Sequence, residues 1–169
     1  MTGMGERSHL PATDVNLKTH ITDIANVLFY EDLSDVILVG HSYGGFVIPG
    51  VANKEPERIK HLVFLDSQTP KNGDAFSDLA GADFVKRGKS NAAERGDGLC
   101  VIGITALNRM GVTEPDDVKW ASERLSGTPV GVVDDPLPFD DPRATQIPKT
   151  YIDCTSRNDK NERAKKGWN

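Results

Sequence analysis

The segment Val36–Gly45 constrains the fold of this chain more than any other. Four apolar residues, Val36–Val39, lead directly into Gly40-His41-Ser42-Tyr43-Gly44, and small and apolar residues continue through Ala52. An apolar strand, a tight turn with a serine at its apex and a following helix are the context of the G-x-S-x-G nucleophile elbow. The pattern predicts a strained backbone at Ser42. It also predicts that the positions two before and two after Ser42 must be small, because strand and helix pass closely there.

The residues of this turn point to acyl-transfer chemistry. A serine at the apex holds its hydroxyl clear of the sheet, and the N–H groups that open the following helix face the oxyanion formed in the reaction. The alternative is a serine that only caps a helix after a tight turn. The buried strand before the turn and the helical stretch after it favour the nucleophile.

Composition excludes several other classes of protein. The chain has 169 residues, enough for one domain, and a net charge of −5 with no basic stripe, which argues against nucleic acid as a partner. Its apolar runs are too short to span a bilayer, and no signal peptide opens the sequence, so we expect a cytoplasmic protein. Gly3-x-Gly5 follows no strand and lacks a third glycine, so no dinucleotide cofactor is expected.

The cysteines indicate neither a disulfide framework nor a metal site. Cys100 and Cys154 lie far apart, with no C-x-x-C pair and no histidine cluster nearby. We expect both to be small buried apolar residues.

The segments around the turn predict a parallel α/β fold. Asn16 is a candidate N-cap for a helix through Tyr30 whose apolar stripe is Leu17, Ile21, Ile24 and Leu28, with His20 at the boundary of that stripe. Arg58–Leu65 and Thr150–Cys154 are predicted to be strands. Strand, helix and strand with a continuous apolar core are typical of parallel sheets.

The sequence of residues 67–148 differs from that of the preceding segments, because glycines, prolines and acids interrupt every apolar run. We predict three domain segments: a core segment at 1–66, a helical lid insertion at 67–148, and a second core segment at 149–169. The alternative for the insertion is a surface elaboration with no role in access. Its expected elements are amphipathic segments at Phe76–Val85 and Leu99–Leu107, a helix from a Thr113 cap to Leu125 that buries Val118, Ala121 and Leu125, an extended piece at Val130–Val133, and a loop at Asp134–Pro142. A basic helix is expected at Asn161–Lys166.

With these segments in place, the sequence resembles the α/β-hydrolase superfamily, and most of all small bacterial esterase-like members related to plant methylesterases and hydroxynitrile lyases. The segments that carry the resemblance are Thr2–Leu10, Asn16–Tyr30, Asp35–Gly50, Pro56–Ile59, His61–Asp66 and Pro148–Cys154. The resemblance implies a partial α/β-hydrolase fold and a cofactor-free serine hydrolase that acts on a small ester-like substrate through a Ser-Asp-His triad.

Site residues follow from the same resemblance. It implies Ser42 as the nucleophile and the backbone N–H of Tyr43 as an oxyanion donor. The acid usually follows the strand that Thr150–Cys154 resembles, which points to Asp159, with Asp66 and Asp153 as rivals.

Substrate contacts are expected from aromatic and apolar residues of the lid, and Trp120 and Phe139 are the candidates we single out. The others are Phe76, Phe84 and Met110, and for each the alternative is plain packing of the lid. The triad does not separate esterase from hydroxynitrile lyase chemistry, because both use it.

The sequence departs from the family at its histidines. His9, His20, His41 and His61 all precede the presumptive acid, whereas the family's catalytic histidine comes last. The family's first strands and its His-Gly oxyanion loop are also without a counterpart. We therefore interpret the chain as the middle of a hydrolase, and we expect its exposed sheet edge to cause either marginal stability or self-association. The alternative functions are a catalytically incomplete hydrolase-like binding module and a non-functional gene fragment.

Overall fold

In the part of the chain that the structure describes, three parallel strands form the central sheet. The computed structural model describes residues 1–10, 12–100 and 104–154. The strands β1 (Val36–His41), β2 (Ile59–Leu65) and β5 (Lys149–Ile152) lie in the order β1-β2-β5, and both neighbouring pairs are parallel. The helix α2 (Gly44–Lys54) connects β1 to β2. The predicted partial α/β fold is therefore confirmed, with a strand–helix–strand unit at its centre.

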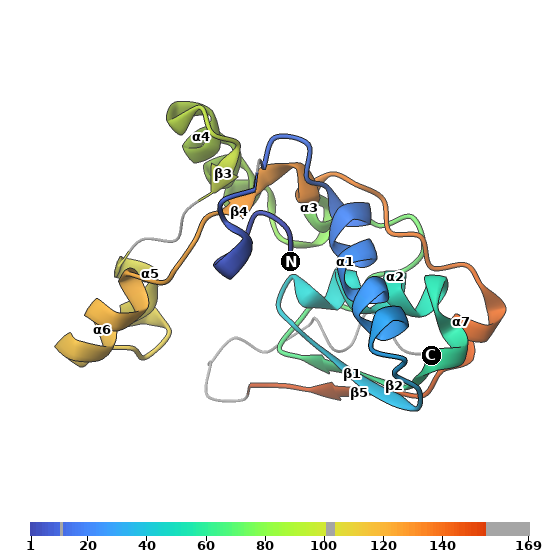
Figure 1. Cartoon of the computed structure of the whole chain (residues 1–169). Helices are drawn as coiled ribbons and strands as arrows, with labels where there is room; N and C mark the ends of the chain where they lie inside the picture. Colours follow the sequence, from blue (N-terminus) through green and yellow to red (C-terminus); the bar gives the residue numbers. More distant parts are fainter. Residues whose placement is uncertain (11, 101–103, 155–169) are drawn as a thin grey trace.

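Among the described residues, helices cover one face of this sheet and none covers the other (Figure 1). Leu38 on β1 lies opposite Leu62 on β2, and Leu62 is fully buried in the core shared with α2. Ile37 and Val39 alternate with Leu38 and are 61% and 55% exposed. The continuous apolar run of β1 predicts a buried strand. Within the described residues that prediction is wrong, since only the face toward the helices is buried.

The helix α1 (Leu17–Tyr30) begins as the sequence predicts. The Asn16 side chain accepts a hydrogen bond from the Thr19 N–H at 2.9 Å, and the Thr19 hydroxyl oxygen accepts one from the Asn16 N–H at 3.3 Å. This reciprocal pair satisfies donors that the first turn leaves without an intrahelical partner.

The buried core combines α1, α2 and β2 with residues just before β5. Its members are Leu17, Ile21, Ala25, Leu28, Phe46, Val47, Ile48, Val51, Ala52, Ile59, Leu62, Phe64, Leu137, Ala144 and Ile147. Residues 137–147 thus contribute to the core, although they fall inside the predicted segment 67–148. The division into segments 1–66, 67–148 and 149–169 stays a prediction.

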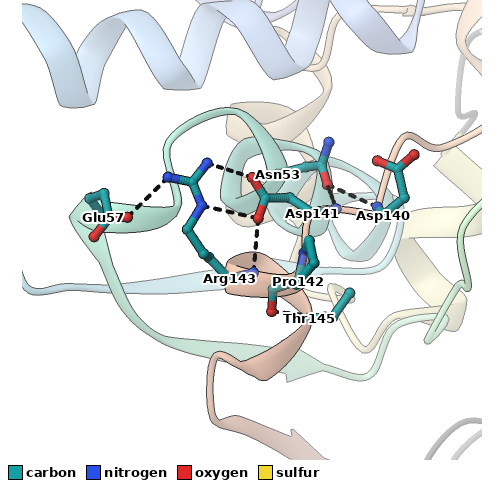
Figure 2. Close-up of polar contacts among 7 residues, drawn as sticks. All are labelled: Asn53, Glu57, Asp140, Asp141, Pro142, Arg143 and Thr145. Atoms are coloured by element: carbon teal, nitrogen blue, oxygen red, sulfur yellow. Dashed lines mark hydrogen bonds and ion pairs between the residues drawn. The ribbon is translucent and has the colours of Figure 1, made fainter.

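A polar network fastens the chain before β5 to the C-terminal end of α2 (Figure 2). The Asn53 Oδ1 accepts the N–H groups of Asp140 and Asp141 at 2.9 and 2.8 Å. The Arg143 guanidinium donates to the Asp141 carboxylate at 2.6 Å and to Glu57 at 3.1 Å. The Arg143 hydrogen bonds lower the pKa of Asp141 to about 2. Because exposed ion pairs of this kind add little stability, the network mainly orients the chain that enters β5.

The other described elements lie mostly between β2 and β5, and all but α4 are short. They are η1 (Gly5–Arg7), η2 (Pro56–Arg58), α3 (Phe76–Leu79), α4 (Ala82–Arg95), β3 (Leu99–Cys100), α5 (Ile104–Arg109), α6 (Pro115–Ser122), β4 (Thr128–Pro129), η3 (Val130–Val133) and α7 (Pro142–Gln146). The strands β3 and β4 form a separate antiparallel pair.

Several boundaries in this region differ from the predictions. The segment 76–85 is divided between α3 and α4 at Gly81, whose φ of +86° is incompatible with a continuous helix. Residues 130–133 form a 3₁₀ turn rather than an extended piece. The last strand is confirmed, with bounds 149–152 in place of 150–154.

The helix α6 also differs from its prediction. It ends at Ser122, its N-cap is Glu114 rather than Thr113, and the cap makes no side-chain hydrogen bond. None of its residues is buried, and Leu125 beyond its end is 42% exposed. The expected burial of Val118, Ala121 and Leu125 is therefore wrong. The cause is that α6 lies away from the main sheet, beside α5 (Figure 1).

The two cysteines are not paired with each other. Cys100 is half-buried and Cys154 is exposed, so the expectation of burial is wrong for Cys154, which follows the end of β5. Across residues 1–10, 12–100 and 104–154, no helix is long and apolar enough to span a bilayer. In the same residues no cluster of His, Cys, Asp and Glu is arranged to hold a metal ion.

Candidate active site

Ser42 lies at the apex of the turn between β1 and α2, where the sequence places it. Its φ of +52° is in the left-handed region, which is unfavourable for a residue with a Cβ. The Ser42 residue is exposed, and its N–H donates to the Leu65 carbonyl at the end of β2 at 3.4 Å. The predicted strained backbone at Ser42 is confirmed. Strain of this kind persists only where neighbouring contacts hold it.

The glycines around Ser42 have different roles. A Cβ at Gly40 would lie 2.5 Å from the Gly44 carbonyl oxygen, so strand and helix do pass too closely there for a side chain. A Cβ at Gly44 would meet nothing within 4 Å, so the predicted need for a small residue two positions after Ser42 is wrong. The crowded position on that side is Gly45, where a Cβ would lie 2.6 Å from the Ser67 Oγ and from the Gln68 carbonyl oxygen. A Cβ at Gly44 would lie in open space, whereas a Cβ at Gly45 would face the chain after β2.

The first turn of α2 leaves an N–H available beside the serine. Gly45 and Phe46 donate to the carbonyls of Ser42 and Tyr43 at 3.0 and 2.9 Å. In the described part of the chain, no backbone carbonyl accepts the N–H of Tyr43. An N–H at a helix start, next to an exposed hydroxyl, is suited to hold a developing oxyanion.

Two carboxylates share the edge of the sheet with Ser42. The ends of the three strands are aligned, because His41 lies opposite Leu65 and Leu65 opposite Ile152. Ser42, Asp66 and Asp153 each follow one of these residues, so they form a row at the carboxyl edge, with neighbouring strands about 4.8 Å apart. Asp66 adopts a φ of +40° and donates its N–H to the Ile152 carbonyl at 2.9 Å. Asp159, the first candidate for the acid, lies outside the described residues, as does the predicted helix at 161–166.

The side chain of Tyr43 points away from the solvent into a polar chain of contacts. Its hydroxyl is 3.1 Å from the His20 Nδ1, and the His20 Nε2 is 2.9 Å from the Thr2 carbonyl oxygen. Thr2 is held by Asp23, which accepts the Thr2 N–H at 2.5 Å and the Thr2 hydroxyl at 3.0 Å. His20 is fully buried, so the predicted boundary position of His20 is wrong. Its helical spacing placed it beside the apolar stripe, but the chain before α1 folds back over that side of the helix.

Burial sets the protonation of this chain of contacts. Burial lowers the pKa of His20 and outweighs the opposing effects of the Thr2 carbonyl and Asp23, which keeps the imidazole neutral at pH 7. Burial, assisted by the Asp135 carboxylate, raises the pKa of the Tyr43 phenol, which therefore retains its proton.

An aromatic cluster covers the other side of Tyr43. The Phe76 ring packs edge-on against Tyr43 at a centroid distance of 5.8 Å and against Phe46 at 5.5 Å. Phe84 on α4 contacts Phe76 at 6.3 Å and is 56% exposed. Of the aromatic residues expected to line a pocket, Phe76 and Phe84 are thus connected to the turn through Tyr43.

The structure does not bring Trp120 and Phe139 to Ser42. Trp120 is 61% exposed on α6, where the Arg124 guanidinium lies over its ring at 4.8 Å. Phe139 lies beside Lys149, whose Nζ is 5.6 Å from its ring, and it precedes Asp140, which is bonded to Asn53. Asn53 is near the C-terminal end of α2, about 15 Å of helix away from the turn.

The histidines of the chain have contacts of their own. The His9 Nδ1 lies 3.2 Å from the Glu6 carbonyl oxygen, and the His61 Nε2 lies 2.8 Å from the Thr150 hydroxyl on the neighbouring strand. His41 is exposed at the end of β1. Within the residues that the structure describes, no histidine is hydrogen-bonded to Ser42.

The chain is similar in sequence to known hydrolases. The family model described as "Alpha/beta hydrolase family" matches residues 1–165. A carbendazim hydrolyzing esterase from Nocardioides sp. (strain SG-4G) is 50% identical over 78 residues, which are 46% of this chain and 32% of that protein.

Solved structures share the fold. An extracellular alpha/beta-hydrolase from a Paenibacillus species superposes with a TM-score of 0.73 at 24% identity, covering 82% of this chain and 58% of that one. A methylesterase from Arabidopsis gives a TM-score of 0.65 at 22% identity, covering 90% of this chain and 62% of that one. The chain thus spans less than two thirds of the length of each of these proteins.

Proposed function

The chain belongs to the alpha/beta hydrolase family, and from that membership we propose that it carries the nucleophile half of a serine esterase site for small ester-like substrates. In this proposal Ser42 attacks the acyl carbon and the N–H of Tyr43 binds the resulting oxyanion. The observation that carries the proposal is the strained, exposed Ser42 between β1 and α2, since folding keeps this costly geometry.

The proposal assigns the acid to the carboxyl edge of the sheet. Asp159 is the candidate that the family resemblance favours, and Asp66 and Asp153 are the described carboxylates on that edge. A triad also requires a histidine base, and the sequence contains none after His61. Because a serine hydroxyl without a base is a poor nucleophile at neutral pH, we expect this chain alone to react slowly.

Chemical rescue tests the proposal directly. The purified chain is treated with a fluorophosphonate probe at pH 7.5, with and without imidazole as an external base. We expect imidazole to increase the labelling rate by at least about 10-fold, because a general base contributes roughly 100- to 10,000-fold when it is ideally placed. Mass spectrometry locates the adduct, which should lie on Ser42.

Two variants control this experiment. Ser42→Ala should remove the labelling, and Ser77→Ala, which changes a serine on α3, should leave it unchanged. A folded sample that is not labelled under either condition would reject the nucleophile assignment and favour a hydrolase-like binding module. Equal labelling with and without imidazole would show that the chain already supplies a base.

The open edge of the sheet supports a second proposal, that copies of this chain associate through β1. Within the described residues β1 pairs with β2 alone, and its exposed Ile37 and Val39 are apolar. Such an edge is a template for pairing with another strand. The double variant Ile37→Lys/Val39→Lys should shift the chain from oligomer to monomer in sedimentation velocity. The control variant Phe29→Lys, at an exposed site on α1, should leave the oligomeric state unchanged. A parent chain that is already monomeric would contradict the proposal.

A further inference from the structure

The buried histidine of α1 is a titratable group that the proposed reaction does not use. His20 is fully buried and joins Tyr43, the residue after the candidate nucleophile, to Thr2 in the N-terminal segment. Burying an imidazole is unfavourable unless both ring nitrogens are hydrogen-bonded, and here both are.

The partners of His20 determine its tautomer. The Thr2 carbonyl oxygen accepts hydrogen bonds and cannot donate, so the Nε2 that faces it carries the proton. In a neutral ring the Nδ1 is then an acceptor, and the Tyr43 hydroxyl donates to it. The direction of the whole chain of contacts is therefore defined, from Tyr43 through His20 to Thr2.

We propose that His20 is a positioning residue of the site: it accepts the Tyr43 hydroxyl at Nδ1, donates to the Thr2 carbonyl from Nε2, and so holds the backbone of the Ser42–Tyr43 turn. We call this arrangement the His20 bridge. The inference rests on the proposed function, because it matters for reactivity only if Ser42 and the N–H of Tyr43 form the reacting site.

The backbone at Ser42 explains why such a bridge is needed. A left-handed φ at a serine relaxes unless the residues on both sides are held. On one side the Ser42 N–H is bonded to Leu65, at a long 3.4 Å. On the other side the Tyr43 side chain is fixed by His20 and by the edge-on contact with Phe76. Without this hydrogen bond the backbone at Tyr43 would be less restrained, and its N–H would move away from the oxyanion position.

The tautomer is tested first, because it does not depend on reactivity. In ¹⁵N-labelled protein at pH 7.5, the His20 Nε2 should show the chemical shift of a protonated nitrogen and the Nδ1 that of an unprotonated one. Tyr43→Phe should shift the Nδ1 resonance and leave the Nε2 resonance in place. The opposite tautomer, or a His20 ring protonated on both nitrogens at pH 7.5, would overturn the bridge.

The positioning role is tested by imidazole-assisted labelling of Ser42. Loss of a whole oxyanion donor lowers the reaction rate about 100- to 1,000-fold. A displaced donor should therefore lower the labelling rate about 10-fold. We expect this loss in Tyr43→Phe and in His20→Gln, with no further loss in the double variant. His20→Asn places an amide oxygen near the Nδ1 position and should recover the rate to within about 3-fold. Tyr30→Phe, at a tyrosine that is 78% exposed, is the matched control.

The two tests separate the possible failures. A parent chain that shows the expected tautomer but is never labelled on Ser42 would reject the proposed function and leave the bridge as a purely structural contact, which overturns its positioning role. A parent chain that is labelled, with Tyr43→Phe labelled at the same rate, would overturn the positioning role while the proposed function stands.

Discussion

Gly40→Ala is expected to disrupt the turn that carries Ser42 and to lower the free energy of unfolding by about 3 kcal/mol, the upper part of the range for overpacked sites. The added Cβ would lie 2.5 Å from the Gly44 carbonyl oxygen, 2.7 Å from its carbonyl carbon and 3.0 Å from the Gly45 nitrogen. These are backbone atoms, which cannot rotate away as a side chain does. Relief requires β1 and α2 to separate. Urea denaturation followed by circular dichroism measures the loss.

Gly44→Ala is the matched control for this prediction. It makes the same chemical change four residues away, at a position where a Cβ meets nothing within 4 Å and which opens α2. Alanine is favoured over glycine in helices by up to about 1 kcal/mol, so this variant should be as stable as the parent chain or slightly more stable. Equal destabilisation by the two variants would contradict the packing that we describe at Gly40.

Phe46→Ala is expected to cause the largest loss of stability, about 3–5 kcal/mol. Phe46 is fully buried on α2, within the core formed with α1 and β2, and its ring packs against Phe76 at 5.5 Å. Truncation removes the ring's burial and leaves a cavity that a crossover helix, joined to strands at both ends, cannot easily fill. Because the free energy of unfolding of a small domain is only about 5–15 kcal/mol, the variant should be partly unfolded near 37 °C.

The control for Phe46 is Phe29→Ala. Phe29 lies on α1 and is 57% exposed, so its truncation should cost less than about 1 kcal/mol. Both variants are compared by urea denaturation at one temperature. A Phe46→Ala variant as stable as Phe29→Ala would show that α2 does not pack on the sheet as described.

The local patterns of the sequence predicted the centre of the fold correctly. The apolar run before Gly40, the cap at Asn16 and the apolar stripe of α1 each depend on neighbours in the chain, and the structure confirms the elements they predict. The same holds for the strained backbone at Ser42, because a tight strand-to-helix turn imposes it locally. These features can be predicted from the sequence because each depends on residues only a few positions away in the chain.

Prediction was weaker between residues 67 and 148. The pattern predicts a helix from Thr113 to Leu125 that buries an apolar face, but α6 lies beside α5, away from the main sheet (Figure 1), and none of its residues is buried. Hydrophobic spacing indicates which face of a helix would be buried, and only the surrounding fold decides whether anything covers that face. The same holds for the aromatic residues expected to contact substrate, because the surrounding fold decides which of them lie near Ser42. Phe76 lies against Tyr43, whereas Trp120 lies beside Arg124 and Phe139 beside Lys149.

The sequence by itself determined that a serine stands at the apex of a strand-turn-helix, because that geometry follows from adjacent residues. Tertiary structure decided which groups surround the serine. It aligned Asp66 and Asp153 with Ser42 at one edge, and it buried His20 between Tyr43 and Thr2. These partners are far apart in the chain, and their contacts arise from strand register and from the path of the first residues over α1. Periodicity within one segment carries no information about either.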